Sequence, residues 1–222
     1  MLLARAIAWG GGVRFLVLAL FVGVLLSGTL LCFLAASNER FPGDLSVMRT
    51  IQAGFFPGEP FANGLRILTG TEVVVAIGLV FATISWLFGK RRPALTFAFG
   101  LAVVVTLQFS LKEIIDRPRP TPDLVDLRSS FSSASFPSGH AMSATYLYGF
   151  LALSSFAADL PSSVRISAIV SVVGLLALAG LVEVFLGMHW PSDVIGGYLW
   201  ALAVLVPTAM VAFPRCFPLY LK

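Results

Sequence analysis

The sequence is poor in charge, and this limits the class of protein that it can specify. Of the 222 residues, 12% are charged and 58% are hydrophobic. A soluble domain carries about twice that charged fraction, so a water-soluble globular protein is excluded. The formal net charge of +4 is small and is spread over the segments between apolar runs. It favours a role in membrane orientation and predicts no nucleic-acid partner.

Cysteine and histidine are also scarce, with two residues of each. Cys32 and Cys216 lie in or beside apolar segments, so we expect buried thiols rather than a disulfide. No Cys-x-x-Cys pair or Cys/His cluster has the spacing of a metal site. The sequence therefore predicts no metal ion and no cofactor.

Long apolar runs are what the chain has instead. Several are roughly 20 residues long, the length that crosses the hydrocarbon core of a bilayer, and a chain in lipid satisfies its backbone best as helices. The first run is too long for the core of a signal peptide and is interpreted as a span. The sequence thus predicts an all-α polytopic membrane protein, a single domain over residues 1–222, with six transmembrane helices at residues 13–37, 66–88, 94–111, 140–158, 166–187 and 192–213.

The distribution of charge predicts how these helices are oriented. One side of the membrane holds both termini, the short turns and a single acid, Asp159. The basic residues of that side are Arg5, Arg14, Lys90, Arg91, Arg92, Arg165, Arg215 and Lys222. The other side holds the two long segments, 38–65 and 112–137. Because positive charge in short loops marks the cytoplasm, we expect the long segments to face the periplasm or the exterior.

The first long segment has its own pattern. Leu45, Met48, Ile51 and Phe55 recur at roughly helical spacing. Two interpretations stay open: a helix lying flat in the headgroup layer, or a loop packed on the tops of the spans. Glu72, near the start of the second span, is interpreted as an interfacial residue.

Three polar stretches fall on the side of the long segments. Two of them lie at the two ends of the long segment 112–137. KEIIDRPRP places Lys112, Arg117 and Arg119 just past the third span. Taken alone, cations at a membrane boundary indicate only side chains that reach for the headgroups. FPSGHAMSAT begins the fourth span, where Ser138 suits an N-cap and His140 falls in the first turn. The N–H groups and positive end of a helix N-terminus suit a phosphate.

The third stretch, LGMHWPSDVIGG, places Asp193 four residues after His189. A carboxylate on an imidazole fixes its tautomer and leaves the other nitrogen free as a base or nucleophile. Both histidines of the chain therefore share one side with Lys112 and Arg119. This combination is typical of phosphoryl transfer without a metal: one histidine attacks phosphorus, the other protonates the leaving oxygen, and the cations hold the equatorial oxygens.

At these residues the sequence resembles the type-2 phosphatidic acid phosphatase (PAP2) superfamily. The three signature motifs of that family are K-x6-R-P, P-S-G-H and S-R-x5-H-x3-D. The first is complete from Lys112 to Pro120, and the second is complete from Pro137 to His140. In the third, His189 and Asp193 match. Three motifs in order, at suitable separations, make the resemblance specific, and the six-span layout agrees with membrane members of the family.

The resemblance implies a role for each matching residue. His189 would be the nucleophile that becomes phosphohistidine, with Asp193 orienting it, and His140 would be the general acid. Lys112, Arg119, Ser138 and Gly139 would bind the phosphate. The resemblance also implies a bacterial cell (inner) membrane as the location, with the lipid bilayer and a lipid phosphate as the partners. It gives no oligomeric state.

One departure from the signature is serious. The Ser-Arg of the third motif falls at Val182-Glu183, so an anion replaces a phosphate-binding cation. Three explanations stay open: Glu183 faces a substituting cation such as Arg117 or Arg128, it binds a positive or hydroxyl-bearing headgroup, or the enzyme is slow or inactive. Because an ionisable residue in a membrane helix is a functional candidate by default, Glu183 and Arg117 are candidates for tuning the choice of substrate.

The sequence therefore favours an integral membrane phosphatase acting on a lipid phosphate or diphosphate. Undecaprenyl diphosphate, phosphatidic acid and phosphatidylglycerophosphate are the candidate substrates. A lipid phosphotransferase and a lipid-phosphate-binding pseudoenzyme remain as alternatives. A transporter or channel is disfavoured because polarity gathers at one face rather than at mid-bilayer.

Overall fold

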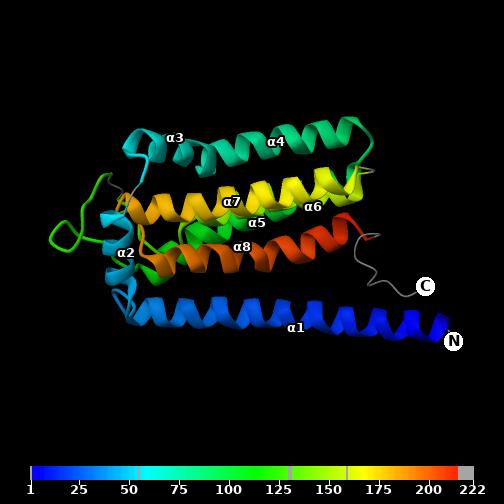
Figure 1. Ribbon diagram of the computed structural model, residues 1–222, viewed down its shortest axis with the longest axis horizontal. Coiled ribbons are helices and arrows are strands. Elements are labelled where there is room, and N and C mark those ends of the chain that lie inside the picture. The colour runs from blue at the N-terminus through cyan, green and yellow to red at the C-terminus, as the bar shows by residue number, and fades with distance from the viewer. Residues whose placement is uncertain (1, 55, 130–131, 159, 215–222) are drawn as a thin grey trace.

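The chain folds into a bundle of long helices. The computed structural model describes residues 2–54, 56–129, 132–158 and 160–214, and within them every regular element is a helix. The helices are α1 (Leu2–Ser37), α2 (Asp44–Ala53), α3 (Glu59–Thr69), α4 (Thr71–Leu87), α5 (Arg91–Ile115), α6 (Gly139–Ala157), α7 (Ser162–Phe185) and α8 (Pro191–Ala212). Figure 1 shows the six long ones, α1 and α4–α8, running along one axis, which agrees with an all-α fold.

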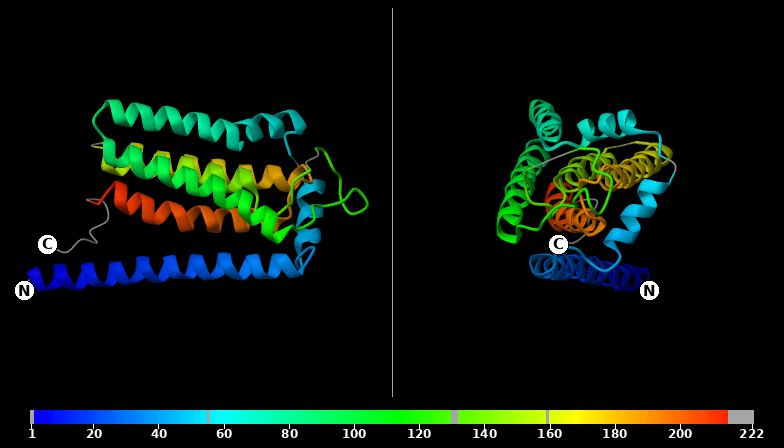
Figure 2. Two further views of the ribbon diagram at one scale, coloured as in Figure 1. Left: turned by 180° about the vertical axis from the view of Figure 1, so that it is seen from behind. Right: turned by 90° about the vertical axis from the view of Figure 1, so that its left-hand side faces the viewer.

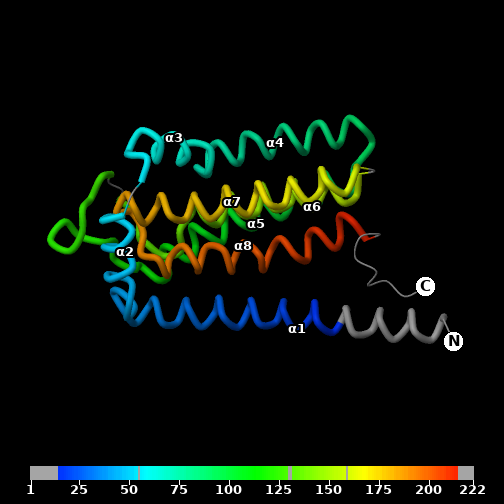
Figure 3. Tube along the Cα trace, viewed as in Figure 1, coloured from blue at the N-terminus to red at the C-terminus, as the bar shows by residue number. Residues whose placement is uncertain are grey.

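Four of the helices are long and apolar enough to cross a membrane, counting only described residues: 15–37 of α1, and α5, α7 and α8. The pair α3 and α4 qualifies together as a fifth span, although its two halves meet at an angle of 44°. This bend corrects the helix expected over 66–88. Gly70 has an extended backbone and separates the halves, so α4 begins at Thr71. Residues 59–65, expected as part of a loop, belong to helix α3. The bend can be followed in Figure 3.

Helix α6 does not meet the hydropathy criterion for a span, because its first half is rich in Ser, Thr, Tyr and His. It lies instead at the centre of the bundle, where it packs against α5, α7 and α8. Two of its buried aromatic residues pack against Phe97 of α5: Phe150 meets it edge to face with the ring centroids 5.0 Å apart, and Tyr146 stacks on it at 5.6 Å. No residue of α6 from Gly139 to Ser155 is exposed, so the polar first half of this helix is shielded from lipid.

A small hydrogen-bonded cluster joins three helices below the start of α6. The side-chain amide of Gln108 donates to Thr71 at 3.1 Å, and its oxygen accepts from Ser143 at 3.0 Å. Gly139 packs against the same amide, where a Cβ would stand 3.3 Å from the Gln108 oxygen. These buried polar groups satisfy one another, which fixes the position of the α6 N-terminus relative to α4 and α5.

One end of the bundle collects the segments that the sequence places together. Helices α1, α5 and α7 end there, α6 and α8 begin there, and the long loop 116–138 folds over it (Figures 1 and 2). We call this the loop end. Helix α2 crosses it and buries Met48 against Val125 and Trp190, so the segment 44–53 is a helix packed on the tops of the spans. Phe55 lies outside the described residues.

The opposite end carries the turn Lys90–Arg91–Arg92 and Arg165. A cleft of about 930 Å³ opens there, and it is lined by Lys90, Arg91, Arg92 and Phe213 among others. Asp159, Arg215, Cys216 and Lys222 lie outside the described residues. The cleft shares no residue with the polar cluster at the loop end.

Candidate active site

The loop between α5 and α6 is held in place by two cations. Lys112, in the last turn of α5, donates to the carbonyl of Ala134 at 2.5 Å. Arg119 donates from Nε to the carbonyl of Ser133 at 2.7 Å and from a terminal nitrogen to the carbonyl of Met188 at 2.5 Å. Both signature cations are thereby fixed at the loop end, beside the segment that leads into α6.

The N-terminus of α6 lies next to that of α8. Ser138 is the N-cap of α6, and its hydroxyl accepts from the N–H of Ala141 at 3.4 Å. The backbone N–H of Ser138 donates to the carbonyl of Asp193 at 3.0 Å. Gly197 makes this approach feasible, since a Cβ there would stand 2.7 Å from the Ser138 carbonyl oxygen. The capped end of α6, with its N–H groups and positive dipole end, therefore faces the same region as His189.

His189 lies in the tight connection between α7 and α8. Gly187 turns the chain with φ +75°, and a Cβ on it would stand 2.5 Å from the carbonyl oxygen of Asp126, so only glycine fits. The imidazole is almost completely buried. Its Nε2 lies 3.4 Å from a terminal nitrogen of Arg119, and its Nδ1 lies 3.6 Å from Oδ2 of Asp193.

The electrostatic surroundings favour a neutral imidazole. Burial lowers the pKa of His189 well below its usual range, and the charges of Arg119 and Lys112 lower it further. A neutral imidazole with Nε2 directed at a cation-lined space has the lone pair that nucleophilic attack requires. The pKa of Arg119 is lowered as well, chiefly by burial and in part by the positive charge of Arg66.

Three groups donate hydrogen bonds to the side chain of Asp193. Its Oδ2 accepts the backbone N–H of Trp190 at 2.9 Å and the hydroxyl of Ser135, while its Oδ1 accepts from Arg117 at 2.5 Å. Arg117 is buried completely and also pairs with Asp44 of α2 at 3.0 Å. Ser192 completes the network by donating its hydroxyl to Asp44 at 2.7 Å and its N–H at 3.0 Å.

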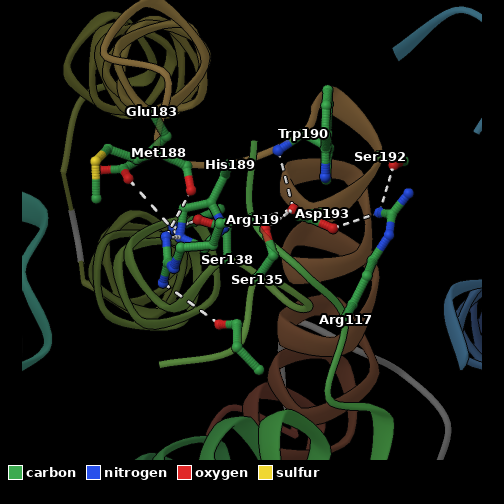
Figure 4. Close-up of polar contacts among 12 residues, drawn as sticks. Arg117, Arg119, Ser135, Ser138, Glu183, Met188, His189, Trp190, Ser192 and Asp193 are labelled. Carbon is green, nitrogen blue, oxygen red and sulfur yellow. Dashed lines mark hydrogen bonds and ion pairs between the residues drawn. The ribbon is translucent and has the colours of Figure 1, made fainter. Parts of the chain in front are cut away.

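Glu183 lies on the other side of His189, near the end of α7, and its side chain is 1% exposed. Its Oε1 lies 3.5 Å from Nδ1 of His140, and its Oε2 lies 3.9 Å from Nε2 of His189. The carboxylate thus stands between the two histidines. Figure 4 shows Glu183 and Arg119 together on one side and Arg117 beyond Asp193 on the other.

Glu183 faces a cation, but not one of the two that the sequence suggested. Its Oε1 pairs with Nε of Arg66, from α3, at 2.8 Å. The prediction of Arg117 or Arg128 is wrong, because Arg117 points to Asp193 and Arg128 stacks on Phe185 with its guanidinium 4.0 Å from the ring centroid. Arg117 therefore lies on the Asp193 side of His189, opposite Glu183.

Arg66 and Asp44 are the residues that sequence reasoning missed. Ala62 lies four residues before Arg66 and Thr69 lies three residues after it, and both Ala62 and Thr69 are buried. This helical periodicity would have placed Arg66 on the inner face of a helix, but the segment before residue 66 was interpreted as a loop. Asp44 gave no comparable signal, since an acid before an amphipathic run is common at a helix start.

The other predicted site residues are brought together. Lys112, Arg119, Ser138, Gly139, His140, His189 and Asp193 all lie at the loop end. Within the described part of the chain, no group of three His, Cys, Asp or Glu side chains is arranged to hold a metal ion.

Comparison with known families decides the membership of the chain. The family model described as the PAP2 superfamily matches residues 93–215, more than half of the sequence and the region that supplies every predicted site residue. The chain belongs to the PAP2 superfamily.

Two similar proteins come from Bacillus subtilis. Phosphatidylglycerophosphatase B of strain 168 is 33% identical over 146 residues, which cover 63% of this chain and 70% of the relative. The crystal structure of a transmembrane PAP2-type phosphatidylglycerolphosphate phosphatase superposes with a TM-score of 0.71 at 23% identity, over 82% of this chain and 92% of that one. The second likeness establishes the PAP2 membrane phosphatase fold.

Proposed function

We propose that this chain is an integral membrane phosphatase that hydrolyses a lipid phosphate through a phosphohistidine intermediate. The observation that carries the proposal is the position of the Nε2 atom of His189, which is buried and lies 3.4 Å from Arg119. The carboxylate of Glu183 stands between this atom and His140. A nucleophile, a proton donor and anion-binding groups thus border one space.

The reaction follows from these positions. The lone pair on His189 Nε2 attacks phosphorus while the bond from phosphorus to the lipid oxygen breaks, and His140 gives that oxygen a proton. A water molecule, deprotonated by His140, then attacks the phosphohistidine, which releases phosphate and restores His189. Lys112, Arg119 and the α6 N-terminus around Ser138 and Gly139 stabilise the equatorial oxygens.

Asp193 orients the nucleophile in this scheme. Its Oδ2 lies 3.6 Å from Nδ1 of His189, a distance that closes to a hydrogen bond when the ring becomes positive on attack. The imidazolium of the phosphohistidine is then stabilised by a carboxylate that the surrounding donors hold in place.

The placement in the membrane is part of the proposal. Helix α6 and the bent pair α3–α4 complete six spans with α1, α5, α7 and α8, in one domain. The loop end faces the periplasm or the exterior of a bacterial cell (inner) membrane, because the basic turn Lys90–Arg92 lies at the opposite end.

Among the candidate lipids, a phosphate monoester with a hydroxyl-bearing headgroup fits best. The curated relative is named as a phosphatidylglycerophosphatase. Within the described residues, Oε2 of Glu183 is a buried oxygen with no hydrogen-bond partner. A headgroup hydroxyl is the donor that such an oxygen needs. Phosphatidylglycerophosphate carries this hydroxyl, whereas phosphatidic acid and undecaprenyl diphosphate do not.

Release of phosphate by the purified protein tests the proposal. The panel is phosphatidylglycerophosphate, phosphatidic acid and undecaprenyl diphosphate, each assayed with His189→Ala as the control and with a second lipid present as acceptor. We expect release from phosphatidylglycerophosphate above all, unchanged in EDTA, and none from the variant. Transfer to the acceptor would make the protein a phosphotransferase. Binding of the lipid without turnover would make it a pseudoenzyme, an outcome that the carboxylate of Glu183 beside the phosphate would explain.

A further inference from the structure

The catalytic region lacks a cation that its own family signature contains. Glu183 stands where the third motif has arginine, so the phosphate loses one positive neighbour and gains a negative one. The guanidinium of Arg66 lies 2.8 Å from that carboxylate. Arg66 belongs to α3 and lies outside residues 93–215, so the family match assigns it no role.

The inner face of α3 holds Arg66 in this position. Ala62 and Thr69, on the same face, are buried, and the Arg66 side chain is itself only 11% exposed. A terminal nitrogen of Arg66 donates to the hydroxyl of Ser129 in the long loop at 3.3 Å. The guanidinium is therefore fixed between α3, α7 and the loop rather than extended into solvent.

The same space receives two other cations. Arg66 pairs with the Oε1 of Glu183 that lies 3.5 Å from His140, and its charge acts on Arg119, which lies 3.4 Å from His189. Three cations, Lys112, Arg119 and Arg66, share this space with the carboxylate of Glu183. The carboxylate of Asp193 also acts on Lys112 and Arg119, but it is paired with Arg117. Cations gather at such short range only when an anion balances them, and a phosphate monoester carries up to two negative charges at neutral pH.

We propose that Arg66 binds the substrate phosphate and supplies, from α3, the positive charge that the third signature motif lacks in this chain. This inference rests on the proposed phosphatase function. A guanidinium has five N–H donors in a planar fork, so one side chain pairs with Glu183 and binds phosphate oxygens together. Glu183 is then the residue that aims Arg66 at the phosphate.

Variants with uncharged side chains distinguish binding of the phosphate by Arg66 from a role in which Arg66 only neutralises Glu183. The set is Arg66→Gln, Glu183→Gln, the double variant with both changes, and Arg49→Gln as the matched control. Arg49 also lies at the loop end, but it donates to the carbonyl of Leu124 and contacts no site residue described above. The measurements are kcat and KM for the best lipid of the panel, and the inhibition constant for inorganic phosphate.

We expect Arg66→Gln to lower kcat/KM by about 10²-fold, the effect of removing one donor to a transition-state oxyanion. The inhibition constant for phosphate should rise at least about tenfold in the same variant, and the double variant should stay impaired. Arg49→Gln should match wild type. Wild-type kinetics in Arg66→Gln, or full recovery in the double variant, would overturn the proposal, because Arg66 would then serve only to neutralise Glu183.

Two further measurements keep the inference separate from the proposed function and from folding. If the wild type releases no phosphate from any lipid, the proposed function fails, and inorganic phosphate then becomes the probe. Phosphate should raise the melting temperature of the wild type and of Arg49→Gln but not that of Arg66→Gln, and an equal rise in all three contradicts the inference. If Arg66→Gln does not fold, Arg66→Lys takes its place and should keep most of the phosphate affinity. If phosphate does not raise the melting temperature of folded Arg66→Lys at all, a role through positive charge is contradicted.

Discussion

Two buried arginines lie on opposite sides of His189, and their surroundings differ. Arg117 is completely enclosed and pairs with two carboxylates, Asp44 and Asp193, at 3.0 and 2.5 Å. Arg66 keeps 11% of its side chain exposed and pairs with Glu183 at 2.8 Å. The first arginine donates to Asp44, Asp193, Ser192 and two backbone carbonyls. The second pairs with the carboxylate that stands between the two histidines, where we propose that the phosphate binds.

We infer from this contrast that buried charge serves two purposes in this site. Behind His189, which is the side of Asp193, Arg117 pairs with both Asp44 and Asp193 and so fixes the orientation of the Asp193 carboxylate. In front of His189, on the side of Glu183, the three cations Lys112, Arg119 and Arg66 are the groups that we propose bind the substrate phosphate. We therefore expect changes behind His189 to alter stability most and changes in front of it to alter substrate binding most.

Removal of Arg117 should have the largest effect of all on stability. Arg117→Met leaves Asp44 and Asp193 buried without their cation, which costs about 3–5 kcal/mol and lowers the melting temperature by roughly 10 °C. Thermal unfolding in detergent measures this. The matched control, Arg128→Met, removes an arginine that stacks on Phe185 at the same end and should cost far less. Equal melting temperatures for wild type and Arg117→Met would contradict the pairing of Arg117 with the two carboxylates.

An exchange of the charges of Glu183 and Arg66, on the other side of His189, should have the next largest effect. Glu183→Arg places two guanidinium groups together and should lower kcat/KM about tenfold or more, because like charges repel in a site with little screening. The second change, Arg66→Glu, restores one cation and one carboxylate and moves the cation to the family position. We expect the double variant to exceed both single variants at least about tenfold, as a pair in direct contact should. Strictly additive losses would show that the two residues do not act as a pair.

Asp44 links α2 to the catalytic carboxylate and should have a smaller effect. Asp44→Asn keeps the shape of the side chain but weakens the anchor of Arg117, so Asp193 orients His189 less well. We expect kcat to fall a few-fold with KM nearly unchanged, the pattern of an interaction realised mainly in the transition state. Asp126→Asn, whose side chain is 77% exposed, is the control. A change in KM alone would place Asp44 at substrate binding instead.

The smallest expected effect is a shift in pH dependence. The pKa of His189 is lowered by burial and by the charges of Arg119 and Lys112. In the proposed mechanism only the neutral imidazole attacks phosphorus. Activity should therefore persist below pH 6.5, near the ordinary pKa of histidine, and fall only at more acidic pH. Arg119→Gln removes one of the cations and should move this acidic limb of kcat/KM upward by a fraction of a pH unit.

The same pKa gives a stability test with a defined sign. Because His189 binds a proton less readily when folded than when unfolded, folding is weakened as the pH falls below about 6.5. His189→Gln should lose less melting temperature than wild type over that range. An identical loss in both proteins would show that His189 does not carry the effect.

Much of the site could be predicted from the sequence because its residues lie in three short motifs at the ends of helices. Apolar run lengths fix which ends meet, and so Lys112, His140 and His189 fall on one side by parity alone. The motif spacing also fixes local relations, such as Asp193 three residues after Trp190 in the first turn of α8.

The partners of the long side chains could not be predicted in the same way. Arg117 and Arg119 are two residues apart in one loop, yet one points behind His189 and the other in front of it. That choice depends on the path of the loop over the helix ends. Arg66 was missed for a related reason, since its contact with Glu183 joins residues 117 positions apart and arises only when α3 packs on α7.

The central claim is that His189 carries the phosphoryl group during turnover, and trapping that group tests it most directly. Wild type is mixed with phosphatidylglycerophosphate, quenched in base during steady turnover and digested for mass spectrometry. Phosphohistidine survives base, so the account predicts a phosphoryl group on the peptide that contains His189. Steady release of phosphate with an unmodified His189 peptide, or turnover retained in His189→Ala, would contradict the account.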